Sequence, residues 1–401
     1  MNARRVFLAV CALGGFSACN LLTGASDLEV GRGGGSSGGE GGQATSSSGG
    51  AASSSSGSTS SSGSTSSGST SSSGSTSSSA SSSSGSITCT PACGAHQHCD
   101  ATHTCVCSPG FVDQGGTCVA APPGDPTTHS QSEVCDRWAD GHVITAPSPL
   151  QASGADCDAG ALVPGAIVDT LVRINMFRWM VGLGPTGDSA SLNASAQKCA
   201  NLEAWWPWTG GSPHSPPASS KCYTAEGAAA AGSSNLAWGS GHPADSIDQF
   251  MRDSGSESTL GHRRWIINPP LDPVGIGYWE TGGPYGNAAC LAVFGSSGDG
   301  PNPPWVALPP PGFVPMTLTS WTWSFHGSVG GVGNATISML RVDDSAPLAV
   351  KVQKLQQGYG QEAISWTPQG WQPEAGKTYR VTVGGLGSGE VSYEVKPVGC
   401  N

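Results

Sequence analysis

Two histidines, His214 and His262, stand in turn-rich surroundings within one stretch of the chain. His214 precedes a Ser-Pro-Pro turn, and His262 lies in the run Gly-His-Arg-Arg-Trp. A Gly/Ala/Ser-rich loop and a helical run that reaches Asp253 separate them. Neutral imidazole nitrogens bind zinc, and a metal site needs two or three such ligands with carboxylates or water. We therefore expect the two imidazoles of His214 and His262 to face one cleft, as candidate ligands of a divalent transition metal such as zinc.

A purely structural interpretation of these residues stays open. His214 can cap the Pro-Pro turn, and His262 can bind backbone carbonyls beneath Arg263 and Arg264. The arginine pair is typical of a solvated or carboxylate-paired surface, or of a rim that binds an anionic ligand. Asn235 favours a role in pinning the backbone, because its amide satisfies both a donor and an acceptor in a buried turn.

The stretch carries no recognised catalytic signature. A zinc-peptidase helix of the form His-Glu-x-x-His is absent. Ser215 stands beside His214, but adjacent side chains seldom point at one another, so Ser215 is not assigned as a nucleophile. We therefore assign no catalytic residue, and we expect binding or adhesion rather than turnover.

The elements that must position these residues follow from hydrophobic periodicity. Steps of three and four residues predict helices over 166–181, 192–205 and 244–253. The period then changes, and the runs 274–279 and 289–294 indicate two strands separated by a Gly/Pro/Asn turn. Helices that cover a short sheet give a layered α/β fold for residues 128–300.

The tail from 301 to 401 has a different pattern. A Pro-rich entry at 309–311 precedes alternating runs at 318–325, 349–352 and 378–383, with glycine turns between them. Period-two alternation at short intervals predicts a β-sandwich, immunoglobulin-like or fibronectin-like in kind.

The central part, 128–300, resembles the CAP superfamily of cysteine-rich secretory, antigen 5 and pathogenesis-related proteins. The resemblance is carried by Ser-Asn-Leu-Ala-Trp-Gly at 234–239 and Gly-His-Arg-Arg at 261–264, with His214 upstream and an acidic helix between. It implies an α-β-α sandwich with a cleft lined by two histidines and two acids. His214, His262 and Asp253 match three of these positions.

The fourth position departs from the family. Ser234 stands where the family has the glutamate of its Gly-Glu-Asn motif, and Glu226, eight residues upstream, is the acid that could take its place. Losing one carboxylate weakens a metal site without abolishing it. Because the superfamily includes lipid binders and ion-channel blockers, lipid or sterol binding is one alternative function, and metal-assisted hydrolysis in the same cleft is another.

The chain has 14 cysteines, and setting aside Cys11 and Cys19 near the start leaves an even number suited to disulfides. Six of them lie in 88–120, where Cys-x-Cys followed by Ser-Pro-Gly-Phe resembles an EGF-like module. That resemblance implies the pairs Cys89–Cys99, Cys93–Cys105 and Cys107–Cys118. The alternative is a metal site with His96, His98 and His103. For the other cysteines we expect the pairs Cys135–Cys157, Cys199–Cys222 and Cys290–Cys400.

The start of the chain indicates export. Residues 1–18 have two arginines, a short apolar run and small residues before Cys19, which resembles a bacterial lipoprotein signal with Cys19 as the lipidated residue. Residues 19–87 are a Ser/Gly-rich stretch that predicts a disordered tether. We therefore expect an exported lipoprotein on a membrane, at the cell surface or facing the periplasm.

The partner class follows in part from charge. The formal net charge is -11, and beyond Arg263 and Arg264 no basic residues cluster after the signal, so the sequence argues against a nucleic-acid partner. The expected partners are the membrane, through the lipid anchor, and an unknown protein, glycan or lipid ligand.

Overall fold

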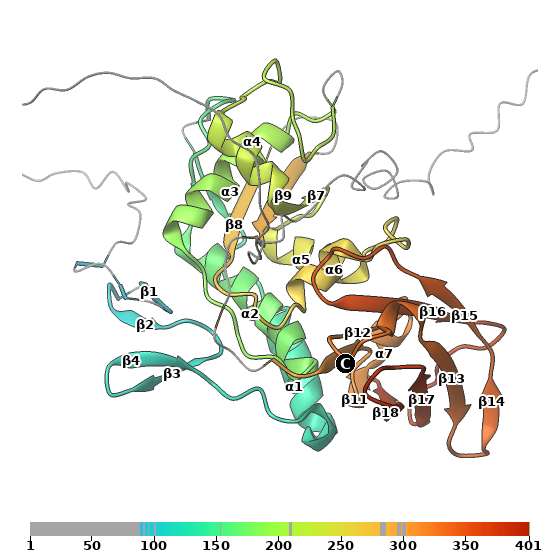
Figure 1. The fold of residues 1–401 in the computed structure, drawn as a ribbon. Coiled ribbons are helices and arrows are strands. Elements are labelled where there is room, and N and C mark those ends of the chain that lie inside the picture. Colours follow the sequence, from blue (N-terminus) through green and yellow to red (C-terminus); the bar gives the residue numbers. More distant parts are fainter. Residues whose placement is uncertain are drawn as a thin grey trace, which may run out of the picture. The chain divides into compact units, whose positions relative to one another are not determined.

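The structure is a computed structural model (Figure 1). It describes residues 89–400 except 91, 92, 95, 100, 101, 153, 208–210, 281–285, 295–297 and 299–301. The predicted signal 1–18, the lipidation residue Cys19 and the tether 19–87 lie outside the described residues. Within the described part, no helix has the length and apolar character that crossing a membrane requires.

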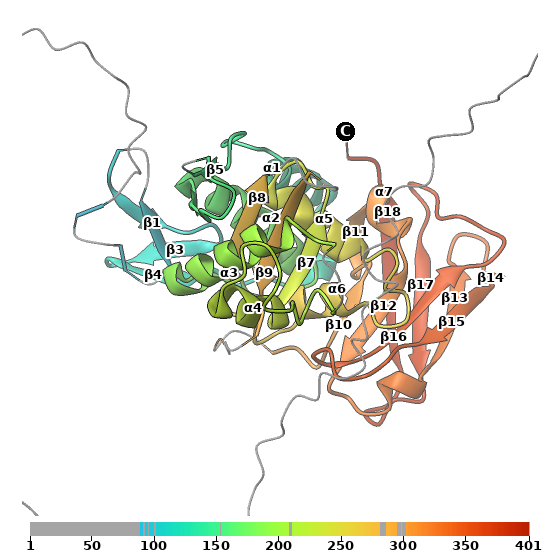
Figure 2. The ribbon, with the colours of Figure 1, turned by 90° about the horizontal axis from the view of Figure 1, so that it is seen from above.

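A three-stranded antiparallel sheet lies at the centre of the α/β part (Figure 2). Its strands are β7 (Ser234–Trp238), β9 (Asn287–Ala292) and β8 (Gly275–Glu280), in that order. Both faces are buried, which explains why apolar residues point to both faces of the sheet instead of alternating with polar ones. The sequence pattern predicted β8 and β9 within two residues of their ends.

Helices cover both faces of this sheet. On one face α3 (Ala190–Glu203) and α4 (Ala225–Gly232) pack on Leu236, Trp238 and Cys290. On the other face α2 (Pro164–Met180), α5 (Pro243–Arg252) and α6 (Gly261–Ile266) pack on Ala237, Tyr278 and Leu291. The chain is therefore a mixed α/β protein with a helix-sheet-helix arrangement in this part.

Glycines in β8 allow the closest of these contacts. A Cβ on Gly277 would lie 2.1 Å from the backbone oxygen of Ala196, and one on Gly275 would lie 2.6 Å from Leu192. Helix α3 therefore packs directly on the strand backbone, and any larger residue at Gly277 would push the helix away.

Besides strand β7, three helices of the α/β part were not predicted by periodicity. They are α1 (Gln131–Gly141), the alanine-rich α4 and the six-residue α6. Helix α1 starts with a capping box in which Ser130 and Glu133 bind each other's backbone N–H groups. Short strands β5 (Leu150–Gln151) and β6 (Ala161–Leu162) form a small separate ladder.

The C-terminal part consists of two sheets that enclose a core of aromatic and branched side chains, including Trp323, Trp366 and Tyr379. One sheet has the order β10 (Trp305–Leu308), β12 (Trp323–Gly327), β16 (Glu362–Pro368), β15 (Val350–Lys354). The other has the order β11 (Gly312–Pro315), β18 (Val391–Val398), β17 (Tyr379–Gly384), β13 (Thr336–Arg341), β14 (Ala346–Leu348). Strand β11 is parallel to β18, and the other pairs are antiparallel.

The alternating run at 318–325 does not form one strand as predicted. Its first residues belong to α7 (Met316–Thr319), and β12 begins only at Trp323. The reason is the turn between the two sheets: Trp323 donates its indole N–H to the Thr319 carbonyl at 2.9 Å and so closes that turn. Two 3-10 turns, Pro126–Thr128 and Val332–Asn334, complete the part of the chain that the structure describes.

Packing continues across residue 300. Val306, Leu308, Leu318 and Trp321 belong to the same buried cluster as the helices of the α/β part. A disulfide joins Cys135 of α1 to Cys400 at the far end of the chain. The C-terminal sheets are thus fixed to the α/β part by a common core and by a covalent link.

The cysteine-rich segment contains two hairpins, β1 (Gln97–Cys99) with β2 (Cys105–Cys107) and β3 (Phe111–Gln114) with β4 (Thr117–Ala120). Cys93–Cys105 and Cys107–Cys118 are disulfides, as the resemblance implied. Cys89 is also disulfide-bonded, and the side chain of its expected partner Cys99 lies outside the described residues. The sulfurs of Cys89, Cys93 and Cys105 lie close together, but their bonding in disulfides leaves no thiolate for a metal.

The other three predicted pairs are wrong. The structure joins Cys135 to Cys400, Cys157 to Cys222 and Cys199 to Cys290 instead of Cys135–Cys157, Cys199–Cys222 and Cys290–Cys400. Proximity in sequence misled the prediction, because α3 covers the sheet face on which Cys290 lies, which brings Cys199 against it.

Candidate functional site

His262 lies on α6 and is oriented by Asp253. Asp253 ends α5 in the left-handed conformation, with φ at 55°, and is buried. Its Oδ1 accepts a hydrogen bond from Nδ1 of His262 at 2.7 Å, and its Oδ2 accepts one from the backbone N–H of Arg263 at 3.3 Å. Asp253 is therefore a positioning residue behind His262 and not a free carboxylate in a cleft.

His214 is oriented by a backbone carbonyl. Its Nδ1 donates to the carbonyl oxygen of Ala231, at the end of α4, at 2.8 Å. Burial lowers the pKa of His214, the Ala231 hydrogen bond opposes this shift, and the positive charge of protonated His262 lowers the pKa further. The ring is therefore neutral at pH 7, and it lies near enough to His262 for the two charges to interact.

Both imidazoles present the same nitrogen. Because a carbonyl and a carboxylate occupy the two Nδ1 atoms, the lone pairs of both rings are on Nε2. No described residue forms a hydrogen bond with either Nε2. The His262 side chain keeps 17% of its surface exposed, so solvent and small solutes reach it.

Asn235 has the backbone-pinning geometry that its amide suggested. It lies on β7 and is buried, and its Nδ2 donates to the carbonyl of His262 at 2.9 Å. Ser234, one residue earlier, points to the opposite face of the sheet, and its buried Oγ has no hydrogen-bond partner among the described residues. Asn235 thus fixes the backbone of the histidine, whereas Ser234 adds no ligand atom that can be assigned.

Glu226 does not replace the missing acid. It lies on the surface in the first turn of α4, where it forms an ion pair with Lys198 and accepts a hydrogen bond from Ser195 at 2.9 Å. These partners lower the pKa of Glu226, so it stays charged and bound at the surface. The expectation that it could turn into the cleft finds no support in its contacts.

Arg263 and Arg264 are not a solvated surface pair. Both are buried, and burial lowers the pKa of each guanidinium to about 10, against the opposing charge of Asp253. Arg263 donates to the carbonyls of Met251 and Thr322, each at 2.6 Å. Arg264 donates to the carbonyls of Gln356 and Gln361 at 2.6 and 2.7 Å. The two arginines therefore connect α6 to the C-terminal sheets.

Arg178 fixes the other end of α6, and no sequence pattern indicated it. The buried guanidinium donates to the carbonyls of Ile266 and Asn268, each at 2.9 Å, and to that of Gly184 at 2.8 Å. A helix of only six residues has little stability of its own. Its position, and with it the position of His262, depends on these arginines and on Asn235.

The donor set fits an open metal site with two protein ligands. Zinc commonly binds imidazoles whose other ring nitrogen donates to a carbonyl or a carboxylate, and His214 and His262 each have such a partner. Apart from the disulfide-bonded Cys89, Cys93 and Cys105, the described residues contain no close group of three His, Cys, Asp or Glu ligand atoms. The remaining positions around an ion would therefore be taken by water or by a ligand.

Comparison with protein-family models, with curated proteins and with solved structures gives no match.

Proposed function

We propose that the chain is an exported, lipid-anchored surface protein that acts in binding, with a CAP-like α/β part whose histidines His214 and His262 bind a transition metal ion such as zinc. The order of motifs supports the CAP-like part, since His214, Asp253 and His262 occur in the family's order and Asn235 follows the position of its glutamate. The helices on both faces of the sheet agree with an α-β-α sandwich.

One observation carries the metal proposal. Each of two neighbouring imidazoles has its Nδ1 bound to a backbone or side-chain oxygen and its Nε2 available. The hydrogen bond from His262 to Asp253 fixes the direction of the ring and leaves Nε2 as the nitrogen that can bind an ion.

The same geometry favours binding over turnover. Hydrolysis assisted by a metal needs a carboxylate or another base that can take a proton from bound water. Both oxygens of Asp253 accept hydrogen bonds, and Glu226 is bound to Lys198 at the surface. The lipidated N-terminus and the tether would hold such a binding part away from the membrane.

Calorimetric titration with zinc tests the proposal. We expect one zinc ion per chain, and we expect His214→Ala and His262→Ala each to weaken binding at least tenfold because each removes one of two protein ligands. His103→Ala is the matched control, since His103 is exposed and lies in the cysteine-rich segment. Zinc binding that is unchanged in both cleft variants would rule out the shared site.

A further inference from the structure

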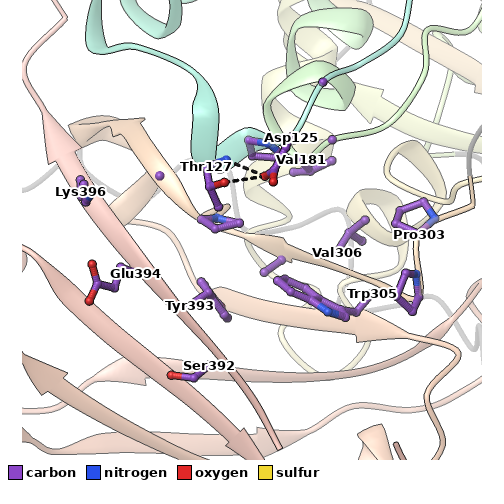
Figure 3. Close-up of a pocket in the computed structure, with 17 residues that line it drawn as sticks. Asp125, Thr127, Val181, Pro303, Trp305, Val306, Ser392, Tyr393, Glu394 and Lys396 are labelled. Atoms are coloured by element: carbon purple, nitrogen blue, oxygen red, sulfur yellow. Dashed lines mark hydrogen bonds between the residues drawn. The ribbon is translucent and has the colours of Figure 1, made fainter.

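A cavity lies away from the histidines, at the junction of the α/β part with the C-terminal sheets. It has a volume of about 660 Å³. Figure 3 shows its walls: Asp125 and Thr127 from the segment before α1, Trp305 from β10, and Tyr393, Glu394 and Lys396 from β18. Ligand sites commonly have this volume and lie at such junctions.

The course of one strand explains why the cavity exists. Strand β10 lies at the edge of one sheet, and the chain then crosses through prolines into β11 of the other sheet. Strand β11 pairs with β18 only from Val395 onward, so β18 has no neighbour on that side at residues 391–394. The gap between the two sheets at this edge is the cavity.

An aromatic wall lines the gap. Trp305 and Tyr393 stack with ring centroids 5.5 Å apart and planes at 29°. No described residue accepts a hydrogen bond from the Trp305 indole N–H. The Tyr393 hydroxyl is buried and also lacks a partner among the described residues. Unpaired buried polar groups are uncommon in proteins, and they call for a ligand or a water.

Charged groups of both signs surround this wall. Asp125 binds Thr127 through Oδ1, at 2.9 Å to the backbone N–H and 2.8 Å to the hydroxyl, and its Oδ2 is left without a described partner. Glu394 binds Arg380 through one oxygen at 2.8 Å. Lys396 forms no ion pair with a described residue, and its ammonium lies 5.6 Å from the centroid of Phe313.

We propose that this cavity binds a saccharide of one or two rings. Asp125 and Glu394 would repel a free anion, and Lys396 would repel a cation. An apolar molecule would leave the polar groups of the wall unpaired. Sugar hydroxyls both donate and accept, so they can donate to the free carboxylate oxygens and accept from the ammonium and the indole N–H. The C–H face of a sugar ring packs on the apolar surface that Trp305 and the prolines supply.

Saturation-transfer NMR with cellobiose, maltose and diacetylchitobiose tests this site in the full chain. We expect ligand signals from at least one of the three, with affinity reduced at least tenfold in Trp305→Ala and severalfold in Lys396→Ala. Trp371→Ala and Lys351→Ala are the controls, because both residues lie in the C-terminal part but not in the cavity wall.

The possible results separate clearly. Signals that fall in the cavity variants and persist in the controls support the site. Absence of signals from all three sugars overturns the saccharide proposal, and equal signals in the wild type and both cavity variants overturn the location. If Trp305→Ala does not fold, Lys396→Ala against Lys351→Ala decides alone. The zinc titration is independent of every one of these results.

Discussion

Asp253 orients the His262 ring through a hydrogen bond and is not a second ligand next to it. The sequence placed both residues in one cleft, and the structure shows why the acid is there: its carboxylate binds Nδ1 of the ring and the backbone of Arg263. Its left-handed backbone conformation turns the side chain back toward α6, directly after the end of α5. The acid therefore orients the histidine and leaves its Nε2 without a partner among the described residues.

The substitution Asp253→Asn tests this function. We expect zinc affinity to fall between about tenfold and a hundredfold, the usual effect of removing a carboxylate that binds a ligating histidine. The fold should persist, because asparagine can still accept from the imidazole. Calorimetry measures the affinity, and Asp343→Asn, at an exposed ion pair with Lys377, is the control. Equal affinities in the two variants would mean that Asp253 serves only to end α5.

At the scale of elements, α6 is the part of the site that depends most on distant residues. Asn235 binds its first turn, Arg178 binds its last turn, and Arg263 and Arg264 connect it to the C-terminal sheets. The carbonyls that these side chains bind would otherwise be buried without a donor, and each such loss costs about 1 to 3 kcal/mol.

Arg264→Met tests the connection to the C-terminal sheets. It removes the donor for the carbonyls of Gln356 and Gln361, so we expect the free energy of unfolding to fall by about 3 kcal/mol. Urea denaturation measures this loss. The control Arg252→Met, at an exposed position, should change the free energy of unfolding by less than about 0.5 kcal/mol. Similar values for the two variants would show that the buried arginine adds no net stability.

Periodicity predicted the long elements and missed the short ones for a physical reason. Helices α2, α3 and α5 have enough turns for an apolar face to repeat, and their ends were predicted within about two residues. Helix α6 has six residues and is stabilised by side chains from three other segments. No local pattern encodes such contacts, and the same holds for the disulfides Cys135–Cys400 and Cys199–Cys290.

For the candidate site, the sequence predicted the residues but not most of their contacts. Motif order identified His214, His262, Asp253 and Asn235, whose types suit their contacts. The partner of His214, a backbone carbonyl at Ala231, has no side-chain signal. The roles of Arg263 and Arg264 were misjudged because charged residues are rarely buried. Carbonyls of the C-terminal part, at Thr322, Gln356 and Gln361, join those of the α/β part in making their burial tolerable.

At the scale of the whole molecule, buried histidines set how stability depends on pH. Burial lowers the pKa of His129, His214, His242 and His326 below the ordinary value of 6.5. Above that value both folded and unfolded chains are neutral at these positions. As the pH falls below it, the unfolded chain takes up protons that the folded chain does not, so stability is lost.

His326 should contribute most to this loss, since burial and the charges of Arg264 and Arg263 lower its pKa furthest. We expect the unfolding temperature to decrease from pH 7.5 to 5.5, and the substitution His326→Gln to make this decrease smaller while preserving a hydrogen bond to Ser324. Calorimetric melting across this range measures both slopes. Identical slopes in wild type and variant would exclude His326 as the cause.

Long-range proton-nitrogen NMR of the histidine rings tests most directly whether His214 and His262 bind one zinc ion through their Nε2 atoms. Without metal, Nδ1 of both rings should carry a proton, because each Nδ1 donates to an oxygen. Added zinc should then shift the Nε2 resonances of His214 and His262 together, and those of exposed His103 should stay in place. A zinc-induced shift in only one of the two rings, or in neither, would contradict a shared site.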